Sequence, residues 1–344
     1  MSIAISGSSI TFPDQTQMST ATGGSFRNRI INGDMRIDQR NAGASVTPAN
    51  GAYTLDRWSY YSTQASKFTV QRNAGSVTPP AGYTNYMGIT STSAFSIAAS
   101  DYFIMTQAIE GFNVSDLSFG TANAKSITIS FWVYSSLTGT FGGVIENSSQ
   151  TRAYPFSYTI SSANTWEQKS VTIAGDTTGT WVTDNGLGLW LMFSLGTGST
   201  YAGTAGAWVG SQKLGVTGAV SVVGTNGATF YITGVQLEQG STATEFERRP
   251  IGVELELCQR YYQGPLFYIG SIRAINGSAV FAQTTVPVSP KMRSAPTISV
   301  SNNVGGVNGQ PSSTQYSHTV LFESATQASM GTIGQFDYTL SAEL

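Results

Sequence analysis

The dipeptide Asn-Gly occurs six times in this chain, first at Asn32-Gly33 and last at Asn308-Gly309, between short β-rich runs. Asn-Gly suits type I′ hairpin turns, because both central residues of such a turn need a positive φ. The runs between these turns are rich in β-branched and aromatic residues, as in "KFTVQR", "SITISFWVYSS", "ATFYITGVQLE" and "SAVFAQTTVPV". Many short strands with Gly-rich turns predict an all-β protein, built as an antiparallel sandwich or jelly roll.

The distribution of large residues divides the chain into four parts. Residues 1–25 are small and polar and predict an extended amino-terminal arm, whereas residues 26–247 contain all six Trp and most of the strand signals, and predict a jelly-roll sandwich. Residues 265–344 contain no Trp and predict a smaller carboxy-terminal β-domain. Residues 248–264 lie between the two β-rich parts and predict a linking helix.

The linking segment has helical spacing and helical end signals. Pro250 suits a first helical position, and Gly264-Pro265 is a stop signal. Apolar side chains recur on two stripes, so the helix should pack either in its own core or between copies of the chain. The longer stripe comprises Ile251, Leu255, Cys258 and Tyr262, which we expect to form a joint between domains and subunits. In the preceding "EFERRP", Glu247 with Arg248 or Arg249 is either a solvated link or an ion pair across subunits.

Composition excludes several classes of protein. Charged residues make up only 10 % of the chain and the net charge is −2, which leaves no basic field for nucleic acid or anionic membranes. A single Cys excludes an intramolecular disulfide. The amino terminus lacks a basic region followed by a long apolar stretch, and the most apolar run, "GLGLWLMFSLG", is too short to span a membrane and predicts a fully buried strand. We therefore expect neither a targeting segment nor membrane insertion.

Residues for catalysis are scarce. The chain has one His, His318, and one Cys, Cys258, and neither lies in a nucleophile motif. A packed core position is the expected role of Cys258. No metal-ligand cluster or cofactor-binding motif can be assembled from spacing, so we expect no enzyme, no metal and no cofactor.

Loop aromatics are the candidates for sugar binding. A pyranose ring stacks on Trp or Tyr while amide or carboxylate groups bind its hydroxyls. Gly- and Thr-rich loops offer this combination at Trp181, Asp184, Asn185, Tyr201 and Trp208. The competing role for these residues is local packing or a subunit contact. Strand contexts assign the remaining tryptophans, Trp58, Trp132, Trp166 and Trp190, to the core.

Two long motifs resemble a known class of protein. "RNRIINGDMRIDQRNAG" with "YTLDRW" resembles the opening of a bacteriophage virion module, and "ITGVQLEQGSTATEFERRPIGVELELCQRYY" resembles its closing signature. The module is similar to the jelly-roll carbohydrate-binding domains of glycoside hydrolases. "ITFPDQTQMSTA" resembles an amino-terminal arm of phage fibre and tail proteins, although Gln15 replaces the usual Gly after "FPD". "VSPKMRSAPTISVSN" resembles a carboxy-terminal β-domain that often follows the module.

The resemblance implies a structural virion protein. It suggests a homotrimeric fibre or tail appendage that attaches to other virion proteins through Ile10, Phe12, Pro13 and Asp14 of the arm, and that contacts a host surface polysaccharide. A purely architectural capsid-decorating or neck protein is the first alternative, and a polysaccharide-degrading enzyme is the second. Each of these places the protein in the virion, after synthesis in the bacterial cytoplasm.

Overall fold

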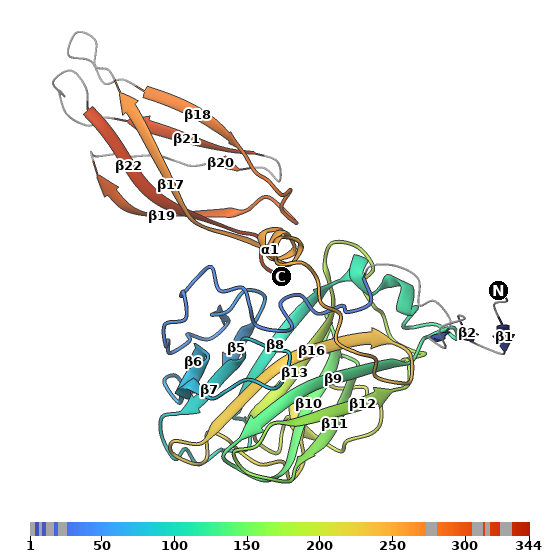
Figure 1. Cartoon of the computed structure of the whole chain (residues 1–344). Coiled ribbons are helices and arrows are strands. Elements are labelled where there is room, and N and C mark those ends of the chain that lie inside the picture. Colours follow the sequence, from blue (N-terminus) through green and yellow to red (C-terminus); the bar gives the residue numbers. More distant parts are fainter. Residues whose placement is uncertain are drawn as a thin grey trace.

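The structure, a computed structural model, describes residues 4–6, 9–11, 17–19, 26–272, 281–304, 312–313, 317–323 and 332–344. It describes side chains at 26–266, 288–299, 317 and 337–344. In these residues the protein is nearly all β, and a two-sheet sandwich is followed by a short helix and a smaller β-domain (Figure 1). The all-β fold class predicted from the sequence is confirmed.

Two antiparallel sheets form the sandwich. The six-stranded sheet has the order β11 (Ala153–Ile160), β10 (Gly139–Asn147), β13 (Leu187–Thr197), β8 (Tyr102–Glu110), β5 (Ser59–Ser62) and β4 (Ala52–Tyr53). The five-stranded sheet has the order β12 (Glu167–Ile173), β9 (Ile127–Ser135), β16 (Thr229–Gln239), β7 (Met87–Ser91) and β6 (Phe68–Arg72). Because successive side chains of a strand point to opposite faces, each sheet has one inner and one outer face.

The core lies between the two inner faces. Leu191 and Phe193 of β13 face Phe131 of β9, and the rings of Phe131 and Phe193 meet edge to face with centroids 5.1 Å apart. All three side chains are fully buried. Burial of one such side chain contributes about 1.5–3 kcal/mol, so this layer supplies a large part of the stability of the sandwich.

Smaller elements surround the sandwich. Short strands β1 (Ala4–Ser6), β2 (Ser9–Thr11) and β3 (Gln17–Ser19) form a sheet near the amino terminus, and β14 (Ala202–Gly203) pairs in parallel with β15 (Gly215–Val216). Three 3₁₀ turns are η1 (Ala74–Ser76), η2 (Gly111–Asn113) and η3 (Ser115–Leu117). The carboxy-terminal domain contains two three-stranded sheets. One has the order β17 (Tyr262–Ile272), β22 (Thr332–Ser341) and β19 (Thr297–Val304), and the other has the order β18 (Phe281–Pro287), β21 (Ser317–Glu323) and β20 (Ser312–Ser313).

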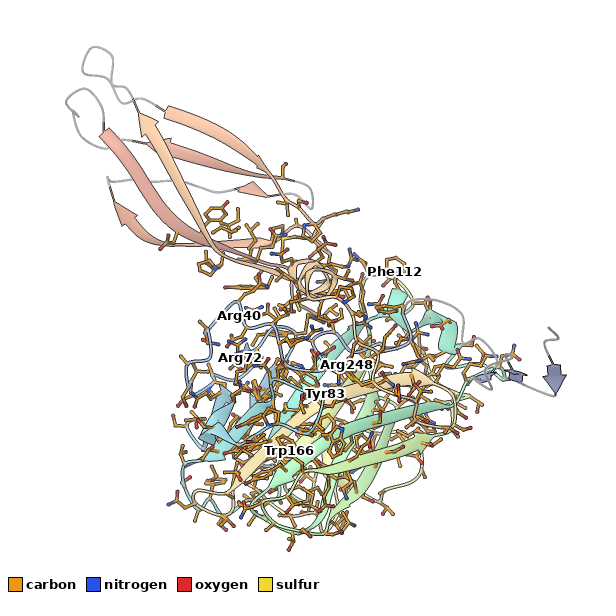
Figure 2. All side chains as sticks on the ribbon, viewed as in Figure 1. Arg40, Arg72, Tyr83, Phe112, Trp166 and Arg248 are labelled. Atoms are coloured by element: carbon orange, nitrogen blue, oxygen red, sulfur yellow. The ribbon has the colours of Figure 1, made fainter. Side chains whose placement is uncertain are left out.

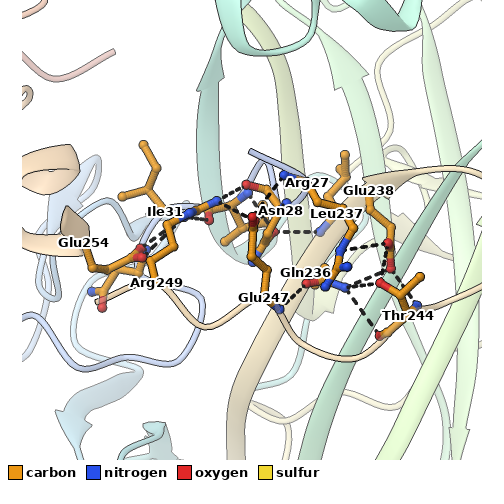
Figure 3. Close-up of polar contacts among 12 residues, drawn as sticks. Arg27, Asn28, Ile31, Gln236, Leu237, Glu238, Thr244, Glu247, Arg249 and Glu254 are labelled. Atoms are coloured by element: carbon orange, nitrogen blue, oxygen red, sulfur yellow. Dashed lines mark hydrogen bonds and ion pairs between the residues drawn. The ribbon is translucent and has the colours of Figure 1, made fainter. Parts of the chain in front are cut away.

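The first and last segments of the sandwich are hydrogen-bonded to each other (Figure 3). The backbone N–H of Asn28 donates to Glu247 at 2.7 Å, and the buried Arg249 guanidinium donates to the carbonyls of Asn28 and Ile30. Arg249 also forms ion pairs with Glu247 at 3.2 Å and with Glu254 at 3.3 Å. We call Asn28, Glu247, Arg249 and Glu254 the terminal clip. It joins the segments at which the sandwich begins and ends.

The linking helix is shorter than predicted. The helix α1 spans Ile251–Gln259, and the chain enters β17 at Tyr262 because Tyr262 pairs with Ser341 of β22. Cys258 is fully buried against Ile31 and Ile37, with Leu255 half-buried beside them, whereas Ile251 is 53 % exposed. The described part of the chain therefore covers only one side of α1. No helix in the described part of the chain is long and apolar enough to cross a membrane.

The end of the chain is bound to the sandwich beside α1 (Figure 1). Glu343 forms ion pairs with Arg40, at 2.6 Å, and with the fully buried Arg57. The guanidinium of Arg57 lies 3.5 Å from the ring centroid of Tyr261, and that of Arg40 lies 3.5 Å from the ring centroid of Tyr262. We call Glu343, Arg40 and Arg57 the carboxy-terminal latch. It binds the second β-domain to the sandwich through charge and ring contacts.

Candidate functional site

A cavity of about 270 Å³ lies on the outer face of the six-stranded sheet. Strands β5, β8 and β13 form its floor, and residues 198–216, which we call the strap, cross beside it. Its lining combines aromatic, aliphatic and amide side chains: Tyr61, Tyr102, Ile104, Thr106, Gln150, Trp190, Met192, Gln212 and Leu214. The volume is close to the lower end of the range of small-molecule sites, about 300 Å³.

The alternation of β13 places an aromatic side chain in this cavity. Leu189 and Leu191 point into the core, so the intervening Trp190 points outward and remains half-exposed. Its antiparallel partner on β8 is Ala108, and Tyr61 of β5 meets the indole edge to face with centroids 5.9 Å apart. Tyr61 therefore supports one side of the outward-facing indole.

Free amide groups complete the lining. The side-chain amides of Gln150, on the turn between β10 and β11, and of Gln212, on the strap, make no hydrogen bond with the residues that the structure describes. Thr106 is different, because its hydroxyl donates to the carbonyl of Leu191 at 3.0 Å. The cavity therefore offers two unoccupied donor-and-acceptor groups next to an aromatic wall.

A buried carboxyl group lies on the same face. Glu146 of β10 is the antiparallel partner of Trp190 and is fully buried, and one of its oxygens accepts the N–H of Lys213 at 3.2 Å. Its other oxygen is buried and has no hydrogen-bond partner among the described residues. Burial raises the pKa of Glu146 to about 8, so the group is largely protonated at neutral pH. In this form Glu146 adds no negative charge to the face that carries the cavity.

Of the loop aromatics proposed from the sequence, Tyr201 lies beside this cavity. Tyr201, on the strap, meets Tyr102 edge to face with ring centroids 5.4 Å apart. Its carbonyl accepts the N–H of Leu214 at 2.9 Å, which holds the two sides of the strap together. Tyr201 therefore positions the ring of Tyr102, a lining residue, and is half-buried itself.

Trp181 and Trp208 form a separate aromatic cluster. Their rings meet edge to face with centroids 5.6 Å apart, and Phe119 contacts both. The two indole N–H groups donate to backbone carbonyls of their own chain, Trp208 to Ala174 at 2.8 Å and Trp181 to Thr178 at 3.2 Å. Both pack against the core. The packing role is the one that these contacts favour.

Asp184 and Asn185 belong to the turn before β13. Asp184 accepts the N–H of Gly186 at 2.7 Å, and its carbonyl accepts the N–H of Phe112. The carbonyl of Asn185 accepts Arg293 at 2.8 Å, which ties this turn to the carboxy-terminal domain. Neither residue lines the cavity.

The joint and arm residues have mixed placements. Glu247 is bound within its own chain by Arg249, and Arg248 lies over the ring of Tyr83, so neither needs a second subunit for its contacts. Cys258 is fully buried, so it is a packing residue, and this burial also raises the pKa of its thiol.

Of the arm residues, Ile10 lies in β2, whereas Phe12, Pro13 and Asp14 lie outside the described residues. His318 lies in β21.

In the described part of the chain, no group of three or more His, Cys, Asp or Glu side chains could hold a metal ion. No protein-family model and no curated protein matches the sequence.

Solved structures share part of the architecture. The enzymatically active domain of tailspike protein 4 of bacteriophage CBA120 is 12 % identical, with a TM-score of 0.36, and the match covers 63 % of this chain and 22 % of that one. A putative sugar binding protein from Bacteroides thetaiotaomicron is 13 % identical over 62 % of this chain and 100 % of that one, with a TM-score of 0.35. A family 11 carbohydrate-binding module from Clostridium thermocellum is 16 % identical, with a TM-score of 0.28, and the match covers 60 % of this chain and 99 % of that one.

Proposed function

We propose that this protein binds an uncharged sugar residue of a glycan in the cavity beside Trp190. The observation that carries the proposal is the pairing of a half-exposed indole with the free amides of Gln150 and Gln212 around about 270 Å³. Sugars present apolar C–H faces and hydroxyl edges, which match an aromatic wall and amide groups respectively. No charged side chain lines the cavity, which favours a neutral sugar.

We propose binding without hydrolysis. A glycosidase of the common type needs two carboxyl groups, about 5–9.5 Å apart, on either side of the scissile bond. Among the described residues that line the cavity, none is Asp or Glu, and the nearby Glu146 is covered and already bonded to Lys213. The alternative, a polysaccharide-degrading enzyme, is tested by the release of reducing sugar from any glycan that the protein binds.

Replacing Trp190 by alanine should abolish most of the glycan binding. Loss of the stacking surface is expected to weaken affinity by at least about tenfold, since aromatic contacts carry much of the binding energy of such sites. A glycan array, followed by calorimetry on the best ligand, measures this. Trp181→Ala is the matched control, because it removes a half-buried indole away from the cavity. Equal binding by both variants contradicts the site, and an array without any hit for the unmodified protein favours the purely architectural alternative.

We further propose that the protein is a trimeric component of a phage virion, a fibre or tail appendage attached by residues 1–25. The support is the resemblance of its opening, closing and arm motifs to virion modules. Exposed Ile251 and Val253, at 53 % and 45 %, also leave apolar helix surface for a second copy. A stable monomer at micromolar concentration, measured as native mass, would argue against the trimer.

Deleting residues 1–25 should leave the thermal unfolding midpoint of the protein nearly unchanged and remove it from virions. The physical reason is that the core of the sandwich, as described, is formed by side chains after residue 26. Differential scanning calorimetry measures the first effect, and immunoblots of purified particles measure the second. Normal incorporation of the truncated chain would refute the role of the arm.

A further inference from the structure

The second site that we infer lies on the opposite sheet of the sandwich. Arg248, Tyr83 and Trp166 are all presented by the side of the molecule that carries the five-stranded sheet (Figure 2). The guanidinium of Arg248 lies 4.6 Å from the ring centroid of Tyr83 and 5.7 Å from that of Phe246. The rings of Tyr83 and Phe246 meet edge to face with centroids 5.5 Å apart. We call Arg248, Tyr83 and Phe246 the arginine platform.

Two glycines and a turn hold the platform in place. The N–H of Tyr83 donates to Pro80 at 3.0 Å, and Gly82 has a φ of +84°, as the third residue of a type II turn requires. A Cβ on Gly82 would lie 3.0 Å from the guanidinium of Arg248. A Cβ on Gly234, in the irregular part of β16, would lie 2.6 Å from the hydroxyl of Tyr83. Each glycine therefore leaves the space that a platform side chain occupies.

The guanidinium of Arg248 is exposed and forms no hydrogen bond or ion pair with the residues that the structure describes. Its neighbour in sequence, Arg249, is buried and donates to carbonyl and carboxylate partners. The carboxylate that acts electrostatically on this region, Asp34, is buried and bound by Arg36 at 2.6 Å. Arg248 thus presents a positive charge with free donors, oriented by two rings.

The chemistry of this arrangement selects a carboxylate on a sugar ring. A planar guanidinium that is stacked on an aromatic face keeps its edge free for bidentate bonds to a planar anion. The half-exposed ring of Trp132 lies on the same face. Trp132 is the antiparallel partner of Thr233, and Thr233 precedes Gly234, which Tyr83 covers. We propose that the arginine platform binds an acidic sugar of the uronate class. This site is independent of the cavity beside Trp190.

Calorimetry of the full chain with an oligogalacturonate tests the proposal. The fully methyl-esterified oligomer is the matched ligand, because it keeps the sugar and removes the charge. We expect binding of the acid form that weakens with added salt, and no measurable binding of the ester. Absence of binding to the acid form, or equal binding of the ester, would overturn the proposal. Equal binding of a polyglutamate peptide would also overturn it, because the site would then recognise carboxylates without a sugar.

Variants assign the binding to the platform. Arg248→Gln should weaken oligogalacturonate binding by at least about tenfold, the scale of charge-assisted hydrogen bonds. Arg248→Lys keeps the charge but loses the planar fork, so it should also bind more weakly than the unmodified chain. Lys125→Gln removes one positive charge from another exposed position and should bind normally. An Arg248→Gln variant with an unchanged unfolding midpoint and unchanged affinity would refute the site.

Discussion

Replacing Arg249 by alanine is expected to lower the free energy of unfolding by about 3–5 kcal/mol, the usual cost of removing one partner from a buried ion pair. The change leaves the carbonyls of Asn28 and Ile30 without this donor, and it leaves the buried carboxylate of Glu254 without its ion-pair partner, although Glu254 still accepts the N–H of Asn32. Arg248→Ala is the control from the adjacent position, and because that side chain is exposed, it should change stability by no more than about 0.5 kcal/mol. Chemical denaturation of the three proteins measures the difference.

The same variant should show a distinctive pH dependence. Burial raises the pKa of Glu254, and the nearby Arg249 opposes this rise. Without Arg249 the folded-state pKa of Glu254 rises further, so the folded state binds a proton that the unfolded state releases near the usual pKa of a glutamate. The destabilisation should therefore be smallest in acid, where both folded proteins hold this proton, and should grow as the pH rises above the already raised folded-state pKa of Glu254 in the unmodified protein. The double variant Arg249→Ala, Glu254→Gln should recover, at neutral pH, part of the free energy of unfolding that Arg249→Ala loses. A loss that does not depend on pH, and that the second substitution does not recover, would contradict this explanation.

Replacing Glu343 by glutamine is expected to weaken the attachment of the carboxy-terminal domain, again by about 3–5 kcal/mol. The change leaves the fully buried Arg57 without its carboxylate, and Arg40 loses its partner as well. Stacking on Tyr261 remains, but it cannot replace the ion pair. We expect a lower unfolding midpoint and faster proteolytic cleavage between the sandwich and the carboxy-terminal domain.

Glu256→Gln is the matched control for the carboxy-terminal latch. It makes the same chemical change on an exposed position of α1. Its unfolding midpoint and its rate of proteolysis should equal those of the unmodified protein. If Glu343→Gln behaves in the same way, the latch does not hold the two domains together.

Sequence patterns predicted the architecture because strand signals are local. β-branched and aromatic runs correspond to β6, β9 and β16 of the sandwich. The prediction of type I′ turns was wrong for the four Asn-Gly pairs that the structure describes, because in none of them do both residues have a positive φ. The end of α1 was predicted less well, since its length depends on a partner remote in sequence. Tyr262 follows the apolar stripe of the helix, but pairing with Ser341 draws it into β17.

The cavity could not be predicted from the sequence. The run "GLGLWLMFSLG" is apolar on both faces of a strand, so alternation could not distinguish the inward Leu191 from the outward Trp190. Gln150 and Gln212 come from a turn and from the strap, and only the fold brings them to β13. Trp181 and Trp208 showed the loop composition of a sugar site, yet their indole N–H groups are bonded to backbone carbonyls. Whether a loop aromatic is presented or packed depends on these long-range contacts.

The terminal clip has a mechanical consequence. The clip bonds join Asn28 to Glu247 and Arg249. In the sequence, Asn28 lies just after residue 26, where the described sandwich begins, and Arg249 lies just before Ile251, where α1 begins. A tensile load applied between the amino-terminal arm and the carboxy-terminal domain therefore has a short route through the clip that does not cross the core of the sandwich. The contacts of Glu343 with Arg40 and Arg57 carry the rest of the load into the sandwich, so a protein pulled at both ends should lose the clip before its sheets separate.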